Sequence, residues 1–181
     1  MLKKFAVISI FLALFSCDHS LPSNDKGSGY FELQTLLDAQ YLELSASDRK
    51  IEKEVSIDGE SETLSIEPDT AIWRSELLVF EPFDPGKARF ANAFQVTELK
   101  GGVRYEKKPD EKQSLQWVEV FQEGDDLSFR AEIIEEASIY TLKKKVAFEI
   151  RSGILTNYSL EGYQKMLLRD TSFFQLKATL R

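Results

Sequence analysis

Seven strand-length segments separated by turn residues fill the second half of the chain, and this pattern constrains the fold more than any other feature. Within the segments, apolar residues alternate with polar ones or form short runs, as β-strands do. The expected strands are Phe90–Glu98, Val103–Lys107, Leu115–Gln122, Leu127–Ile134, Ile139–Ile150, Ile154–Gln164 and Thr171–Leu180. Turns such as Gly101-Gly102 and Ser152-Gly153 are too short for crossovers, so the segments predict an antiparallel β-meander.

The alternation gives this sheet one apolar and one polar face. In the last segment the apolar set comprises Phe174, Leu176, Ala178 and Leu180, and the opposite set comprises Gln175, Lys177 and Thr179. Because an antiparallel sheet of this kind leaves one face in water and buries the other, its apolar face needs a cover.

Three elements upstream of the meander are candidates for that cover. Residues 30–44 carry apolar side chains at helical spacing. The segments 51–57 and 60–66 flank Asp58-Gly59, a strong hairpin signal. A second amphipathic helix is expected to begin at Asp69, whose carboxylate suits an N-cap.

Together these elements predict a single α+β domain over residues 30–181. Its antiparallel β-meander is expected to form a curved sheet or half-open barrel, covered by the two N-terminal helices and the β-hairpin. Cys17 is the only Cys of the 181 residues, so no disulfide within the chain can support the domain. Its stability must therefore come from the apolar core.

The N-terminus has the pattern of an export signal. Met1–Lys4 is basic and Phe5–Phe15 is apolar apart from Ser9, which is typical of a secretory signal peptide. The run is shorter than the about 20 residues that a spanning helix needs. It ends in Leu14-Phe15-Ser16-Cys17, which resembles the lipobox of bacterial lipoproteins. That resemblance implies cleavage after residue 16 and attachment of fatty acyl groups to Cys17.

The residues after Cys17 bear on where the domain is placed. Residues 17–29 are mostly small and polar, and we expect a flexible linker with a span of roughly 20 Å. Two or more acyl chains hold a protein stably at a bilayer, so the membrane is the expected partner of the N-terminus. Asp18 resembles the inner-membrane retention signal of enteric bacteria. The periplasmic face of the outer membrane is nevertheless the location we expect.

Charge and residue usage narrow the function classes. Cleavage removes two of the 23 basic residues, which leaves 21 against 30 acidic ones. Such a surface repels phosphates, so nucleic acid is not an expected partner. The only His is His19, in the expected linker, which excludes His-based catalytic triads and metal sites from the folded domain. We therefore expect no enzymatic activity, no metal and no cofactor.

Two acidic pairs and one lysine run remain as candidate sites. Glu135-Glu136 and Asp125-Asp126 fall where turns are expected, so solvated turn residues are a better interpretation than the paired carboxylates of a glycosidase. In the run 143–145, Lys144 falls on the apolar face of its strand. We expect its ammonium group to reach solvent or a carboxylate, and the alternative is a polar pocket for an anionic ligand.

Aromatic residues of the expected strands allow two interpretations. They are Trp117, Phe121, Phe129, Tyr140, Phe148, Tyr158 and Phe174. The first interpretation is ordinary core packing, and the second is a cavity enclosed by the curved sheet.

Three short motifs extend a resemblance over most of the chain after the signal. They are Tyr30-Phe31-Glu32-Leu33, Trp73-Arg74-Ser75-Glu76-Leu77 and Tyr163-Gln164-Lys165. With the lipobox and the hairpin, they resemble a group of small uncharacterised lipoproteins of Gram-negative bacteria. The resemblance implies a lipid-anchored envelope domain and assigns no activity.

Two functional hypotheses follow. The first, which we favour, is a membrane-anchored, non-catalytic module that binds an envelope protein or has a scaffold role. The alternative is a carrier that holds a lipid or another apolar ligand inside the helix-covered sheet, and it needs an interior cavity of about 300–1,000 Å³.

Overall fold

The computed structural model describes residues 30–181. The expected signal segment, Cys17 and the linker up to residue 29 lie outside the described residues. The helices are α1 (Leu33–Ser45), α2 (Thr70–Leu78) and the short 3₁₀ helices η1 (Glu81–Phe83) and η2 (Ala88–Phe90). The strands are β1 (Ile51–Ile57), β2 (Glu60–Ile66), β3 (Phe94–Leu99), β4 (Gly102–Lys107), β5 (Leu115–Glu123), β6 (Asp126–Ala137), β7 (Tyr140–Arg151), β8 (Ile154–Met166) and β9 (Ser172–Leu180).

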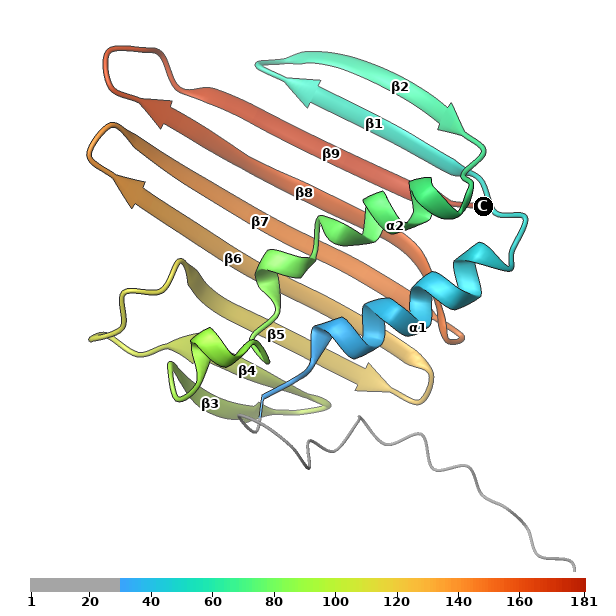
Figure 1. The fold of residues 1–181 in the computed structure, drawn as a ribbon, viewed down its shortest axis with the longest axis horizontal. Helices are drawn as coiled ribbons and strands as arrows, with labels where there is room; N and C mark the ends of the chain where they lie inside the picture. Colours follow the sequence, from blue (N-terminus) through green and yellow to red (C-terminus); the bar gives the residue numbers. More distant parts are fainter. Residues whose placement is uncertain (1–29) are drawn as a thin grey trace, which may run out of the picture.

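The strands of residues 30–181 form one nine-stranded sheet in the order β2-β1-β9-β8-β7-β6-β5-β4-β3. All neighbouring pairs are antiparallel. Strands β3 to β9 follow one another along the chain, which confirms the predicted antiparallel meander and the α+β class. The sheet is open, with β2 at one edge and β3 at the other (Figure 1).

The hairpin β1–β2 occupies a different place from the one expected. Its strands pair across Asp58-Gly59 in the register of a two-residue loop. The prediction that this hairpin covers the sheet is wrong, because β1 pairs with β9 along its whole length and extends the sheet. The pairing satisfies the backbone groups that β9 would expose as an edge strand. It also aligns Ile51 with Leu180 and Val55 with Leu176 on one face.

Helices α1 and α2 lie across one face of the sheet (Figure 1). Phe80, which follows α2, meets Phe148 of β7 and Tyr158 of β8 edge to face, at ring-centroid distances of 5.1 and 5.5 Å. Phe148 in turn stacks on Phe129 of β6 at 4.8 Å. Aromatic rings therefore fill the space between the helical segment and the central strands.

Side chains remote in sequence attach α1 to the rest of the domain. The buried carboxylate of Asp84 accepts a hydrogen bond from the backbone N–H of Leu33, 3.1 Å away, at the start of α1. Farther along, the buried amide of Gln40 accepts from the backbone N–H of Leu155 at 2.7 Å and donates to the carbonyl of Gly153 at 2.9 Å. The two bonds of Gln40 hold the helix over the turn between β7 and β8.

Three element boundaries can be compared with the expectations. Asp69 caps α2 as predicted, since its carboxylate accepts from the backbone N–H of Ile72 at 2.8 Å. The first helix begins only at Leu33, because the Tyr30 side chain is buried and its hydroxyl bonds the backbone of Phe94. The first meander strand also starts at Phe94, since the residues before it form η2.

One lysine on the helix-covered face has a carboxylate partner. Lys53 lies in β1 opposite Ala178, and its ammonium nitrogen is 2.5 Å from an oxygen of Glu76 in α2. Only 12% of the Lys53 side chain and 14% of the Glu76 side chain are exposed. The other oxygen of Glu76 accepts a hydrogen bond from the hydroxyl of Tyr158. Burial, and then this bond, raise the pKa of Tyr158 well above its usual range.

Candidate binding site on the polar face of the sheet

The seven aromatic residues that could have lined one cavity are divided among three environments. Phe129, Phe148 and Tyr158 are at most 3% exposed and pack in the core. Trp117 pairs with Glu132 on the face turned away from the helices. The bulge between Leu115 and Trp117 shifts the register at that point, so the strand no longer carries both residues in simple alternation.

The other three aromatic residues do not join this core either. Phe121 pairs with Ser128 on the same polar face. Tyr140 and Phe174 lie on the helix-covered side and are partly exposed. The positions of the rings do not support the alternative interpretation of one cavity lined by all seven, and core packing describes the three buried ones.

A pocket of about 360 Å³ lies on the polar face, over neighbouring parts of β7, β8, β9 and β1. Two rows of cross-strand neighbours form it. The first row comprises Lys143, Tyr163 and Phe173, and the second comprises Lys145, Glu161, Gln175 and Ser56. Because directly paired residues of antiparallel strands point to the same side, the sheet register alone brings these side chains together.

An aromatic wall is the distinctive feature of this pocket. Tyr163 and Phe173 are direct partners in β8 and β9, with ring centroids 6.1 Å apart. Phe173 is 58% exposed. Two adjacent rings on the face turned away from the helices have no core to stabilise, which is typical of a binding surface.

The turn of the β1–β2 hairpin fixes the position of Phe173. The carboxylate of Asp58 accepts hydrogen bonds from the backbone N–H of Phe173 at 2.7 Å and from the hydroxyl of Ser172 at 2.9 Å. The backbone N–H of Asp58 donates to the carbonyl of Phe173 at 2.9 Å. Asp58 has a φ of 52°, a conformation that Asp tolerates better than most residues. The β1–β2 hairpin, which joins the sheet instead of covering it, thus forms this end of the pocket.

Gly162 lets β7 and β8 approach closely beside the aromatic wall. A Cβ atom at this position would lie 1.9 Å from the carbonyl oxygen of Lys143 and 2.8 Å from the ring of Phe174. Any side chain would therefore move a strand or displace that ring. The residue between Glu161 and Tyr163 is restricted to glycine by contact with backbone.

A buried glutamate holds the two lysines of the pocket. One oxygen of Glu132 in β6 lies 3.0 Å from the ammonium group of Lys143 and 3.9 Å from that of Lys145. The Glu132 side chain is only 11% exposed, whereas those of Lys143 and Lys145 are 29% and 46% exposed. The lysine ends are thereby held above the sheet, where they can contact a ligand.

Lys144, the lysine singled out from the sequence, lies on the other face. It pairs with Ile133 and Gly162 on the helix-covered side and is half-buried. Among residues 30–181, no hydrogen bond or ion pair holds its ammonium group, so of the two expected outcomes, solvent or a carboxylate, the carboxylate is not found there. The 360 Å³ pocket is lined by Lys143 and Lys145 instead. The predicted position of Lys144 on the apolar face is confirmed, and the pocket lies on the opposite face.

The acidic pairs also differ from expectation. Glu135-Glu136 belongs to β6, which continues to Ala137 opposite the first residues of β7, so the prediction of a turn at this pair is wrong. The reason is that the β6–β7 hairpin is longer than the apolar pattern indicated. Asp125 does lie in the turn between β5 and β6, and Asp126 is the first residue of β6.

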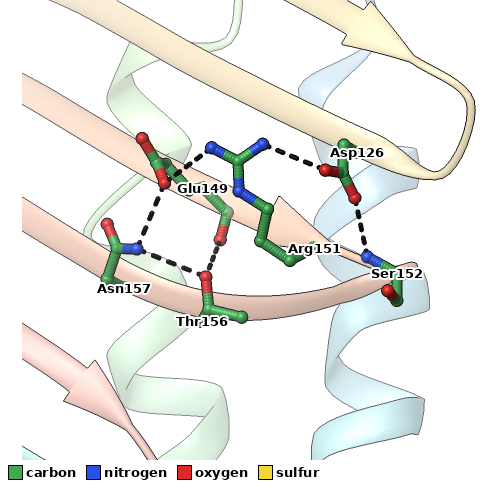
Figure 2. Close-up of polar contacts among 6 residues, drawn as sticks. All are labelled: Asp126, Glu149, Arg151, Ser152, Thr156 and Asn157. Atoms are coloured by element: carbon green, nitrogen blue, oxygen red, sulfur yellow. Dashed lines mark hydrogen bonds and ion pairs between the residues drawn. The ribbon is translucent and has the colours of Figure 1, made fainter.

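Asp126 belongs to a polar network at the other end of the sheet (Figure 2). Its carboxylate accepts from the backbone N–H of Ser152 at 2.8 Å and lies 3.1 Å from the guanidinium of Arg151. The guanidinium also donates to Glu149 at 3.0 Å, and Asn157 donates to the same carboxylate. The bond from Ser152, and then Arg151, lower the pKa of Asp126. With its carboxylates already paired, the network serves to fasten the β7–β8 turn.

Within residues 30–181, no group of three carboxylate, His or Cys side chains is placed to hold a metal ion. The helices of this part of the chain also include none with both the length and the apolar character of a membrane span. Comparison of the chain with protein families, curated proteins and solved structures finds no match.

Sequence reasoning missed Tyr163, Phe173 and Glu132 as site residues. A signal for Phe173 was present, because the alternation that sends Phe174 toward the core sends Phe173 to the polar face. Phe173 forms an aromatic wall only together with Tyr163. That pairing is set by the sheet register and cannot be seen in either strand alone.

Proposed function

We propose that the chain is a lipid-anchored, non-catalytic binding module of the bacterial cell envelope, and that the pocket walled by Tyr163 and Phe173 is its contact site. The observation that carries this proposal is the position of the pocket. It lies on the polar face, where Phe173 is exposed, Tyr163 is partly exposed, and Glu132 forms an ion pair with Lys143. The favoured placement is the periplasmic face of the outer membrane, although Asp18 leaves the inner membrane as the other candidate.

The packing of the interior counts against the carrier hypothesis. A carrier would need space between the helices and the sheet, yet Phe80, Phe148 and Tyr158 meet there at ring-centroid distances of 5.1 and 5.5 Å. Native mass spectrometry of the exported full chain with Cys17→Ser tests this point. We expect the bare mass of the protein. A co-purifying lipid that survives desalting would restore the carrier hypothesis and contradict the proposal.

The anchor is tested by expressing the wild-type chain and Cys17→Ser in a Gram-negative host. We expect the wild type in the membrane fraction, with a mass increased by acyl groups, and the variant without that increase in mass. The motif at residues 14–17 supports this expectation. Recovery of wild-type protein in the soluble fraction, with a free thiol at Cys17, would contradict the lipoprotein proposal.

A further inference from the structure

The pocket on the polar face combines aromatic surface with both kinds of hydrogen-bonding group. The ammonium group of Lys145 only donates, the carboxylate of Glu161 only accepts, and the amide of Gln175 does both. Hydroxyl groups also donate and accept. A ligand rich in hydroxyls therefore matches this set of side chains better than a ligand that only accepts hydrogen bonds.

The charges around the pocket favour a neutral ligand. Lys143 is paired with Glu132, and Lys145 has Glu161 as its direct cross-strand neighbour. An anion placed here would approach the carboxylates of Glu161 and Asp58, and a cation would approach the two lysines. Neither sign of charge finds an uncompensated partner in the pocket.

Size and exposure favour a ring over an extended apolar chain. A volume of about 360 Å³ is near the lower end of the ~300–1,000 Å³ range of small-molecule sites. Phe173, at 58% exposure, offers a free ring face beside Tyr163. The C–H face of a pyranose packs on such a ring, while its equatorial hydroxyls point to the polar groups around it.

We propose that this pocket binds a neutral sugar ring of an oligosaccharide. The ring stacks on Phe173 and contacts Tyr163, whose plane is tilted by 56° from that of Phe173, and its hydroxyls bond to Lys145, Glu161 and Gln175. The inference rests on the proposed function and gives the ligand class for the same site. Association is reversible, and no covalent bond forms or breaks.

The test is isothermal titration calorimetry of the exported full chain with Cys17→Ser. The probes are the neutral trisaccharides N,N′,N″-triacetylchitotriose, maltotriose and cellotriose, with a sulfated heparin disaccharide and inorganic phosphate as anionic counterparts. We expect at least one neutral trisaccharide to bind, and Phe173→Ala to weaken that binding about tenfold or more. Phe121→Ala, which removes a ring from the same face outside the pocket, is expected to change affinity by less than about twofold.

Preferential binding of either anionic probe would overturn the inference, as would unchanged affinity in Phe173→Ala. Because Phe173 is largely exposed, the variant is expected to fold, and an unaltered circular dichroism spectrum checks this.

A photo-reactive phenylalanine analogue in place of Phe173 separates the two levels of the proposal. Crosslinks to a protein without any saccharide binding would overturn the sugar inference and leave the binding module standing. If neither protein crosslinks nor saccharide binding is observed, and the wild-type protein is soluble, the proposed function is overturned as well.

Discussion

The two faces of the sheet carry the same kinds of side chain in opposite settings. On the helix-covered face, Phe129, Phe148 and Tyr158 are 0–3% exposed; Phe148 and Tyr158 pack against Phe80, and Phe129 stacks on Phe148. On the polar face, Phe173 is 58% exposed beside a pocket. The identity of a residue therefore does not separate core from binding surface. What separates them is which side of the strand the residue occupies and whether a helix lies over it.

Ion pairs show the same contrast. The pair of Lys53 and Glu76 is 12% and 14% exposed beneath α2, whereas that of Arg151 and Asp126 is 50% and 43% exposed. A pair held away from water becomes costly when one partner is removed, because the remaining charge loses both its partner and its hydration. An exposed pair only exchanges its partner for water.

The largest expected effect compares one ring from each face. Phe148→Ala removes a buried ring that touches Phe80 and Phe129, and we expect it to lower the free energy of unfolding by about 3–5 kcal/mol. Phe173→Ala is expected to change it by less than about 0.5 kcal/mol. Urea unfolding followed by circular dichroism measures both values. Equal losses in the two variants would mean that Phe173 is part of the structural core and would undo the comparison.

The buried ion pair gives the next largest effect. Glu76→Leu leaves Lys53 without its anion and Tyr158 without an acceptor, and we expect a loss of about 3 kcal/mol in the free energy of unfolding. Adding Lys53→Met should recover most of that loss, because the unpaired buried charge is then gone. A double variant no more stable than Glu76→Leu would show that the two charges are not coupled.

Alkaline pH tests the covered face by a different route. Burial and the bond to Glu76 raise the pKa of Tyr158, so its contribution is fully present below the unfolded pKa of about 10. Above that pH the unfolded chain loses the proton while the folded protein keeps it, and stability falls. The slope approaches about 1.4 kcal/mol per pH unit for this one group.

Tyr158→Phe should remove that part of the slope while other groups keep theirs. Unfolding curves of the wild type and the variant between about pH 9 and 11 provide the measurement. Parallel slopes would show that the Tyr158 hydroxyl is not held in its neutral form by the fold. Tyr105, whose pKa burial also raises, is unchanged in both proteins and belongs to the common background.

Local patterns account for the part of the fold that could be predicted. Alternation and turn residues define the meander, and the carboxylate of Asp69 marks the start of α2. The attachment of α1 could not be read in the same way, because Asp84 reaches Leu33 from 51 positions away. The pairing of β1 with β9 is equally non-local. The alternating pattern of either strand is compatible with several partner strands and does not select one.

The candidate site was predictable only in fragments. The lysine run and the polar-face position of Phe173 are visible in the sequence, but the pocket exists because four strands align in one register. The sequence singled out Lys144 because it falls on the apolar face. The lysines that line the pocket are its two neighbours, Lys143 and Lys145.

The smallest effect is expected for Arg151→Gln. This variant breaks the exposed ion pair with Asp126, for comparison with the buried pair of Lys53 and Glu76. Asp126 keeps its bond from the backbone of Ser152, and Glu149 keeps Asn157, so the turn retains its main supports (Figure 2). We expect a slight decrease of the urea midpoint at low ionic strength that vanishes in about 1 M NaCl, where charges are screened within about 3 Å. The buried pair should keep most of its effect at the same salt concentration, because its side chains are only 12% and 14% exposed and are screened much less. A salt-independent loss in Arg151→Gln as large as that of Glu76→Leu would show that the exposed face carries as much of the stability as the covered one.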